Sequence, residues 1–513
     1  MGFNNWARYM GALNESLFVS TAEAMISTGL LTAGYNRINL DDEWSTMERS
    51  ANGSMVWDST KFPRGLPWLT AHLKSRGFIP GKYTDAGNLS CGGFPGALNH
   101  EETDAADFAR WGFEYLKLDG CNMPDTSEAT YRRVYGKWHT ILSSMADPMV
   151  FSESAPAYFA EAANLTDWYA VMGWVQQYGQ LARHSRDSLV WNSTNYWPDI
   201  TGWDSITFNY GQQVRLARFQ RPGFFNDPDF LTVDHFDTTI DEKRSHFALW
   251  CAFSAPLILS TDVLNITAEE IAYLTNKDFL DVDQDPLVQQ ATLVSQDGSW
   301  DVLTRSLYNG DRLLVVLNRQ AEIGDIEVPW ARIGLSPETL NTPPSLLAKN
   351  LWTGKETTVD LAAGGIIAKA VPAHGTAAFR LSHPSPGSSV RVIPTGMIFN
   401  TYSLHCLTDS RCGSLIWANC TARDSQVWRA RPDGTVSSLL DESKCITEEA
   451  GGVVATKKCD GEGKKWDYFV SGNLINAHTQ HCLTEGEGGE AYAADCGYLT
   501  NEQVIALPAG MTI

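Results

Sequence analysis

The sequence has little positive charge and no apolar stretch long enough to cross a membrane. Lysine and arginine total 39 against 60 aspartate and glutamate residues, which gives a formal charge of −21. This charge would repel a polyanion such as nucleic acid or an anionic membrane surface. The longest apolar segment, FALWCAFSAPLILS, has the length of a buried helix and strand. We therefore expect a neutral substrate, with no nucleic acid and no membrane as partner.

The motifs of several enzyme classes are also missing. The 11 histidines form no HExxH or other paired ligand spacing, and the early cysteines form no CxxC pair. The segment DPDFLTVDHFD does not have the spacing of a calcium loop, and neither a G-x-S-x-G elbow nor a Walker loop occurs. We expect no metal and no cofactor.

Several features indicate a secreted protein. The first residues, MGFNNWARYM, contain no basic segment followed by an apolar one, so we expect any secretory signal to have been removed already. The 10 cysteines suit an oxidising compartment. Sequons for N-glycosylation add to this expectation and occur at Asn14, Asn52, Asn88, Asn164, Asn192, Asn265 and Asn419.

The C-terminal region carries a cysteine pattern that repeats three times. Each pair of cysteines is 14 positions apart, and the units recur after 39 and 37 residues. A period near 40 repeated three times predicts an array of like units that share one core. In an oxidising compartment one disulfide within each unit follows. The three predicted pairs are Cys406 with Cys420, Cys445 with Cys459, and Cys482 with Cys496.

The Cys-Leu/Ile-Thr starts of these units and the Gln426-Val-Trp428 close resemble the ricin B-type lectin domain, a β-trefoil, over residues 396–513. The resemblance implies a possible second carbohydrate site in the β-trefoil. The aspartate that the family usually has two positions after the first cysteine is replaced here by Thr408, Thr447 and Thr484. A structural or spacer role therefore stays open beside sugar binding.

Three further segments precede the trefoil. Residues 383–395 are rich in Pro, Gly and Ser and read as a linker, whereas 289–382 alternate short apolar runs with turns, which predicts an antiparallel β domain of the sandwich type. Residues 1–288 alternate strand-like with helix-like segments, as in YNRINLDDEW, LPWLTAHLKSRG and FIPGKYTDAG. This order predicts an α/β fold with a parallel sheet, and its length favours a (β/α)8 TIM barrel.

Acidic and other polar residues recur where the predicted barrel strands end. In a barrel, chemistry takes place at the C-terminal ends of the strands. One such carboxylate can simply cap the following helix, but a ring of them at one mouth exceeds what capping predicts. The residues in question are Asp41, Asp42, Tyr83, Asp85, Lys117, Asp119, Asp199, Asp227, Asp229 and Asp262.

The segment YLKLDGC places Lys117 and Asp119 two positions apart in an apolar strand. A strand has a period of two, so both side chains face the barrel interior. They could form a structural ion pair, or the lysine could keep Asp119 ionised and oriented as a carboxylate nucleophile. With a second carboxyl as acid and base, and with neither a metal motif nor a phosphate loop, the pattern favours glycoside hydrolysis.

The first 380 or so positions resemble glycoside hydrolase family 27, the α-galactosidases and α-N-acetylgalactosaminidases. Matching motifs include INLDDEW, GKYTDAGNLSCGGFPG, YLKLDGC, FSESAPAYF, WPDI and FFNDPDFL, in family order. The resemblance implies that Asp119 is the nucleophile and Asp199 the acid/base of a retaining enzyme, about 5 to 5.5 Å apart. It also implies a disulfide between Cys91 and Cys121 beside the nucleophile, and sugar contacts or near contacts from Trp6, Asp41, Asp42, Tyr83, Lys117 and Asp229.

The resemblance also bears on the sugar. Ser154 and Ala157 occupy the positions that open the 2-position of the sugar in the acetamido-specific enzymes, and Tyr158 follows as it does in those enzymes. The favoured reading is an exo-acting α-N-acetylgalactosaminidase that removes terminal sugars from glycans. α-Galactosidase or β-L-arabinopyranosidase activity of the same family remains an alternative, as does a carbohydrate-binding protein with an inactive barrel. The family arginine four residues before the acid/base is replaced by Asn195, and Asp204 is the one close alternative to Asp199.

Overall fold

The computed structural model describes residues 1–189, 200–335, 345–385, 387–410, 413–461 and 463–508. Eight parallel strands form its first sheet, in the order β7-β6-β5-β4-β3-β2-β1-β8. A parallel bridge between Leu231 and Leu259 joins the segment after β7 to β8 and closes the barrel, which confirms the predicted TIM barrel. The strands are β1 (Gly2–Asn4), β2 (Arg37–Asn39), β3 (Ile79–Asp85), β4 (Tyr115–Asp119), β5 (Val150–Glu153), β6 (Leu181–Arg183), β7 (Phe225–Asp227) and β8 (Ile258–Leu259).

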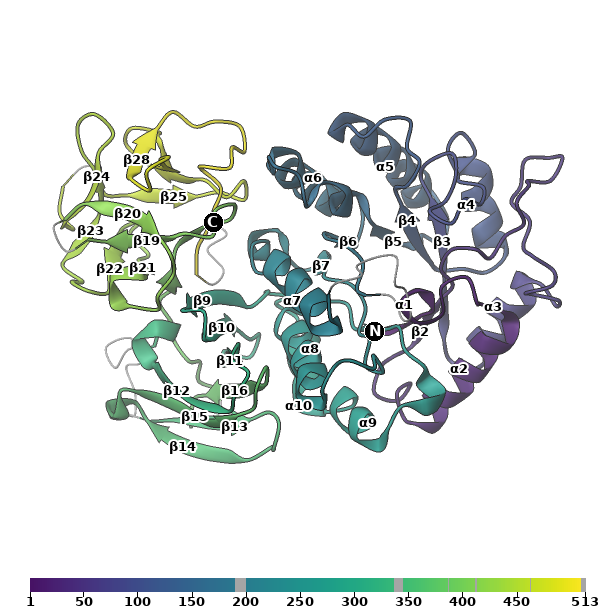
Figure 1. Cartoon of the computed structure of the whole chain (residues 1–513), viewed down its shortest axis with the longest axis horizontal. Coiled ribbons are helices and arrows are strands. Elements are labelled where there is room, and N and C mark those ends of the chain that lie inside the picture. The colour runs from purple at the N-terminus through teal and green to yellow at the C-terminus, as the bar shows by residue number, and fades with distance from the viewer. Residues whose placement is uncertain (190–199, 336–344, 386, 411–412, 462, 509–513) are drawn as a thin grey trace.

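Helices surround this sheet (Figure 1). Side chains that accept hydrogen bonds from the first turn cap several of them: Ser127 caps α5, and Thr239 with Glu242 forms a capping box on α8. The helices bury their apolar sides against the strands and so form one large core. They are α1 (Trp6–Tyr9), α2 (Glu15–Ser27), α3 (Leu66–Ser75), α4 (Glu101–Arg110), α5 (Glu128–Ser143), α6 (Thr166–Tyr178), α7 (Gly202–Gln213), α8 (Ile240–Ala252), α9 (Ala268–Leu274) and α10 (Lys277–Asp283).

An antiparallel β domain follows the barrel. Six of its strands form a sheet in the order β14-β13-β16-β11-β10-β9, and β12 pairs with β15. Buried aliphatic side chains such as Val294, Leu314 and Val316 build its own core. Its strands are β9 (Thr292–Gln296), β10 (Trp300–Ser306), β11 (Arg312–Asn318), β12 (Gly324–Pro329), β13 (Ser345–Asn350), β14 (Glu356–Asp360), β15 (Gly365–Val371) and β16 (Thr376–Ser382).

The third region consists of short antiparallel strands around a core that includes Trp428 and Trp466, and it fits the predicted β-trefoil. The three predicted disulfides are present, each with an S–S distance between 2.03 and 2.07 Å. The strands are β17 (Thr395–Met397), β18 (Phe399–Asn400), β19 (Cys406–Asp409), β20 (Leu415–Ala418), β21 (Val427–Ala430), β22 (Val436–Ser438), β23 (Lys444–Glu448), β24 (Val454–Lys458), β25 (Trp466–Tyr468), β26 (Leu474–Asn476), β27 (Cys482–Glu485), β28 (Ala491–Ala494) and β29 (Ile505–Ala506).

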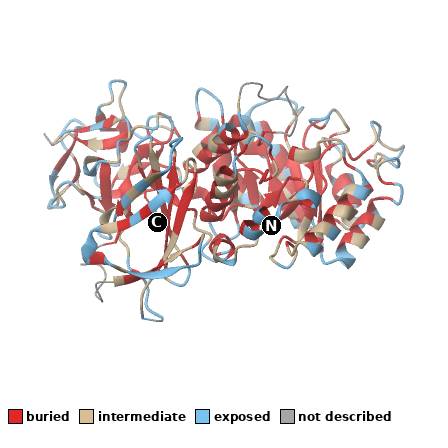
Figure 2. Cartoon of the chain, turned by 60° about the horizontal axis from the view of Figure 1, so that its bottom comes forward, coloured by how far each residue is buried: buried red, intermediate tan, exposed pale blue. Residues whose placement is uncertain are grey.

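The trefoil and the β domain both lie against one side of the barrel, near α6, α7 and α8 (Figure 1). The Tyr169 hydroxyl of α6 is 2.8 Å from the Thr401 hydroxyl, and Arg218 Nε donates to the carbonyl of Val470 at 2.9 Å. The junction continues the buried interior of the barrel into the β domains (Figure 2). Among the described helices none is long and apolar enough to cross a membrane.

Candidate active site

A cavity of about 190 Å³ opens at the C-terminal ends of the barrel strands. Ten sequence-predicted residues line it together, namely Trp6, Asp41, Tyr83, Cys91, Lys117, Asp119, Cys121, Ser154, Ala157 and Tyr158. Four further residues, Arg183, Ser185, Arg186 and Asp187, come from β6 and the segment after it. The barrel therefore gathers side chains from five strand ends and from α1 around one space.

The charge on Lys117 is balanced chiefly by Asp41. The Lys117 ammonium lies 2.8 Å from Asp41 Oδ2, and the same oxygen accepts a hydrogen bond from the Asn4 side chain at 2.8 Å. Burial alone would lower the pKa of Lys117, but the charges of Asp41 and Asp119 raise it above its usual value. Lys117 thus stays cationic and lends positive potential to Asp119, although its direct ion-pair partner is Asp41 and not Asp119 as the two-residue spacing suggested.

Asp119 is held by donors from two directions. Its Oδ1 accepts from the Tyr158 hydroxyl at 2.6 Å and from the backbone N–H of Gly120 at 3.0 Å. Burial and the Asp119 charge keep the pKa of Tyr158 well above its usual value, so the phenol remains a donor. The second oxygen of Asp119 accepts no hydrogen bond from the described residues, which leaves it available to attack a substrate carbon.

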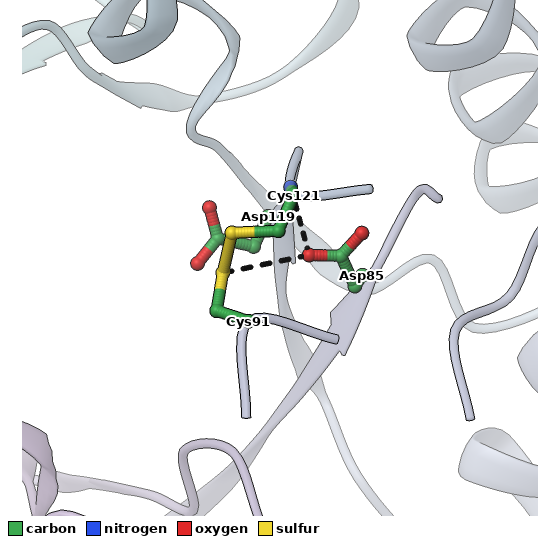
Figure 3. A group of neighbouring side chains, drawn as sticks. All are labelled: Asp85, Cys91, Asp119 and Cys121. Carbon is green, nitrogen blue, oxygen red and sulfur yellow. Dashed lines mark hydrogen bonds between the residues drawn. A yellow bond between two sulfur atoms is a disulfide. The ribbon is translucent and has the colours of Figure 1, made fainter. Parts of the chain in front are cut away.

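A disulfide forms one wall beside this carboxylate. Cys91 and Cys121 are joined with an S–S distance of 2.01 Å, and Asp85 accepts from the backbone N–H of Cys121 at 3.0 Å (Figure 3). Burial, then the neighbouring Asp119, raises the pKa of Asp85 well above its usual value. Within the described part of the chain Asp85, Cys91, Asp119 and Cys121 bring four potential metal ligands within 4.8 Å, but the disulfide consumes both thiolates.

Two predicted sugar-contacting residues lie behind the wall instead of lining the cavity. Asp42 accepts from the backbone N–H of Gly92 at 2.8 Å and so fixes the loop that carries Cys91. Asp229 is 2.7 Å from Arg183 and accepts from the backbone N–H of Ser188. Both carboxylates therefore support neighbours that do face the cavity.

Arg183 and Asp187 are the residues that sequence reasoning missed. Arg183 Nη2 lies 2.9 Å from Asp187 Oδ1, and both side chains line the cavity. Burial raises the pKa of Asp187, but the charges of Arg183 and Lys117 outweigh it and lower the pKa below its usual value. The signal was present in the sequence, because Arg183 stands four residues before Asp187, the spacing that the family resemblance requires and that Asn195 does not provide before Asp199.

The two carboxylates named from sequence have different outcomes. Asp199 lies outside the described residues, so its role stays a prediction. Asp204 accepts from the backbone and the hydroxyl of Thr201, at 2.9 and 2.8 Å, and forms the capping box of α7. Asp204 is absent from the cavity lining and serves the helix terminus.

Three polar atoms of the lining residues are buried without a hydrogen-bond partner among the described residues. They are the Tyr83 hydroxyl, the Ser154 hydroxyl and Nε of Arg183. An unsatisfied buried hydroxyl costs roughly 1–3 kcal/mol, and a ligand that carries hydroxyl groups can satisfy it. The wall is therefore suited to a polyhydroxylated ligand of no net charge.

Arg186 forms the rim beside Asp187. Its guanidinium is held by both carboxylate oxygens of Glu161 and lies 3.7 Å from the centre of the Phe208 ring. Glu161 follows the short helix η1 (Ala155–Phe159) that carries Ala157 and Tyr158. Arg186 therefore links the segment after β6 to the segment after β5, and it lines the same cavity as Ala157.

Comparison with known proteins agrees with this architecture. Residues 5–285 match the family model described as alpha galactosidase A, residues 297–381 its C-terminal β-sandwich domain, and residues 394–503 the ricin-type β-trefoil lectin domain. Alpha-galactosidase A of Aspergillus niger is 49% identical over 520 residues, which cover 100% of this chain and 92% of that protein.

Solved structures show the same fold over the first three quarters of the chain. α-Galactosidase I from Mortierella vinacea has a TM-score of 0.66 at 27% identity, with 76% of this chain and 97% of that chain covered. A structure titled as a putative α-N-acetylgalactosaminidase from Bacillus halodurans has a TM-score of 0.58 at 16% identity, with 75% of this chain and 97% of that chain covered, and so shows the fold alone. The chain belongs to glycoside hydrolase family 27, the alpha galactosidase A family, and carries a C-terminal ricin-type β-trefoil.

Proposed function

We propose that this protein is a retaining α-galactosidase that removes terminal α-linked galactose, with Asp119 as nucleophile and Asp187 as acid/base. The observation that carries the proposal is the single cavity in which both carboxylates meet the unsatisfied hydroxyls of Tyr83 and Ser154. Paired carboxylates facing a wall of hydroxyl partners suit the hydrolysis of a neutral glycoside.

The reaction would proceed through two displacements at the anomeric carbon. Asp119 attacks that carbon as the bond to the leaving oxygen breaks, and protonated Asp187 gives its proton to that oxygen. Water then attacks the glycosyl ester, Asp187 takes the proton from the water, and the ester bond to Asp119 breaks. The sugar leaves with its original anomeric configuration.

Asp187 is preferred over Asp199 for a positional reason. Asp187 lines the same cavity as Asp119 and is paired with Arg183 at 2.9 Å. The arginine orients the carboxyl group, as a bidentate-capable guanidinium does for a carboxylate partner. Asp199 remains the competing assignment, and the two are separated by substitution.

Galactose is preferred over N-acetylgalactosamine for two reasons. The relative that covers the whole chain at 49% identity is named an α-galactosidase, whereas the acetamido reading found no support beyond a fold-level likeness. In addition, the charged residue Arg186 lines the same cavity as Ser154 and Ala157. An acetamido methyl gains most from an apolar site, whereas the Ser154 hydroxyl can pair with a 2-hydroxyl group.

The proposal is tested by the hydrolysis of nitrophenyl α-galactoside and nitrophenyl α-N-acetylgalactosaminide by one preparation. We expect kcat/KM to favour the galactoside by at least about tenfold, the scale of a single well-placed polar contact. Equal rates, or a preference for the acetamido sugar, would contradict the choice of galactose and restore the reading of Ser154 and Ala157 as an acetamido pocket.

A matched variant sharpens this test. Ser154→Ala removes the hydroxyl but changes the volume little, so kcat/KM for the galactoside should fall about tenfold. The acetamido substrate has no 2-hydroxyl, and its rate should stay the same. An equal loss on both substrates would mean that Ser154 serves the wall and not the 2-hydroxyl.

A further inference from the structure

A second cavity, of about 160 Å³, lies where the barrel, the β domain and the trefoil meet. Its barrel wall is the segment from Val214 to Pro222, which leads into the N-terminal end of β7. The proposed active site lies at the opposite, C-terminal ends of the strands. The volume is well above what one water molecule requires, so a small ligand fits.

Three arginines line this junction cavity at successive three-residue intervals: Arg215, Arg218 and Arg221. No ion pair to any of the three occurs in the described part of the chain, and no aspartate or glutamate is among the lining residues. The absence of carboxylates stands out in a chain whose formal charge is −21. Three guanidinium groups thus line one space that no carboxylate lines; Arg215 is partly buried, and Arg221 is exposed and donates to the carbonyl of Gln176 at 3.0 Å.

Arg218 provides the buried member of the group. Only 7% of it is exposed, its Nε donates to Val470 at 2.9 Å and its Nη1 to the carbonyl of Arg215 at 2.8 Å. Its Nη2 is buried and has no hydrogen-bond partner among the described residues. A buried charged donor without a partner is costly, and an anion in the cavity would satisfy it.

The trefoil fixes the position of this guanidinium. A side chain at Gly472 would come within 3.1 Å of Arg218 Cζ, so the turn that follows Val470 packs directly on the guanidinium. Burial lowers the pKa of both Arg215 and Arg218, and the nearby phenols of Tyr169 and Tyr468 offset this effect only in part. The Gln289 side chain also lines the cavity. Its Oε1 accepts from the backbone N–H of Ser306, so its amide nitrogen is the group that can donate to a ligand.

We propose that the junction cavity binds a small tetrahedral oxyanion, of the phosphate or sulfate class, between the arginines of the barrel and the trefoil. The guanidinium groups present several N–H donors to the oxygens of such an anion, which neutral sugars do not require. Bound between domains, the anion stabilises the docking of the trefoil on the barrel in proportion to its concentration.

The test is isothermal titration of the full chain with inorganic phosphate, with sodium sulfate and sodium chloride titrated in parallel at matched ionic strength. We expect one phosphate per chain with a measurable dissociation constant, similar binding of sulfate, and no saturable binding of chloride. Acetate serves as a fourth titrant to separate tetrahedral oxyanions from carboxylates.

The variant pair keeps Arg218, because its Nε bond to the carbonyl of Val470 joins the barrel to the trefoil. The double variant Arg215→Gln with Arg221→Gln should bind phosphate at least about tenfold more weakly, since charged hydrogen bonds are lost. Its control, Arg133→Gln with Arg391→Gln, removes two exposed charges elsewhere and should bind as the unchanged protein does. Melting temperatures without phosphate check that all variants are folded.

Several results would overturn the proposal. They are the absence of saturable phosphate binding, equal affinity in the Arg215→Gln, Arg221→Gln variant, an equal loss in the control variant, or binding of acetate in place of phosphate and sulfate. Each result concerns affinity alone and is independent of whether the barrel hydrolyses a galactoside.

Discussion

The barrel and the trefoil differ in what their distinctive residues do. In the barrel, the motif residues converge on a cavity and leave polar atoms such as the Tyr83 and Ser154 hydroxyls without partners. In the trefoil, by contrast, the threonine hydroxyls two positions after the first cysteine of each repeat have hydrogen-bond partners within the protein. Thr408 and Thr484 accept from Gln426 and Gln503 at 2.9 and 3.0 Å. The Tyr83 and Ser154 hydroxyls are thus open to a ligand, whereas the threonine hydroxyls at these repeat positions are already bonded within the protein.

In the trefoil, threonines stand at the positions where the ricin-type resemblance predicts sugar-contacting aspartates. Thr447 Oγ1 donates to the carbonyl of Cys445 at 3.1 Å, and the equivalent threonines bond the carbonyls of Cys406 and Cys482. Each of these bonds lies within a single strand, between a threonine and the cysteine two positions before it. The repeat can therefore preserve the fold while its sugar-binding positions are used for packing, and a sugar site in the trefoil stays a prediction.

The largest expected effect concerns the proposed nucleophile in the barrel. Asp119→Asn keeps the volume and the hydrogen bond from Tyr158 but removes the nucleophile, so kcat on nitrophenyl α-galactoside should fall by at least about 10⁴-fold. The melting temperature should change little. Substantial residual activity in a preparation free of unchanged protein would overturn the assignment of the nucleophile.

The second prediction concerns the removal of one disulfide from the trefoil. The double variant Cys445→Ala, Cys459→Ala opens a loop of sequence separation 14, and its loss should destabilise the trefoil by about 3 kcal/mol. Hydrolysis of nitrophenyl α-galactoside at 25 °C should stay within about twofold, because the bond lies far from the cavity. Denaturant unfolding measures the first quantity and initial rates the second, and a large loss of rate would show that the regions are not separate.

A third test concerns the electrostatics of the acid/base. Arg183 and Lys117 lower the pKa of Asp187, while the first step needs Asp187 protonated. Activity should therefore fall as pH rises above an acidic optimum. Arg183→Met removes one of the lowering charges, so the pKa of Asp187 rises and the alkaline limb of kcat/KM moves to higher pH. If the alkaline limb of kcat/KM stays at the same pH in Arg183→Met, whatever the absolute rate, then Asp187 is not the titrating acid.

Much of this architecture could be predicted because each domain has its own pattern in the sequence. Strand and helix alternation gave the barrel, the period near 40 gave the three-fold unit, and the cysteine spacing gave the disulfides that the structure contains. The group around Asp119 was predictable because strand ends of a barrel converge on one mouth.

The features that could not be predicted depend on contacts between residues far apart in the sequence. The partner of Lys117 is Asp41, 76 positions away, and the period of a strand carries no information on such a pair. The WPDI motif favours Asp199 as acid/base, whereas only the fold shows that Arg183 and Asp187 line the cavity of Asp119. Likewise, the motif around Ala157 carries no information on Arg186, which comes to the same cavity from the segment after another strand.

The most direct test of the central claim compares Asp187→Asn with Asp199→Asn on nitrophenyl α-galactoside and on an unactivated galactosyl disaccharide. An acid/base contributes about 10² to 10⁴ in rate, and most where the leaving group is poor. We expect such a loss for Asp187→Asn, larger on the disaccharide, and nearly unchanged rates for Asp199→Asn. The reverse pattern, with the loss confined to Asp199→Asn, would contradict this expectation.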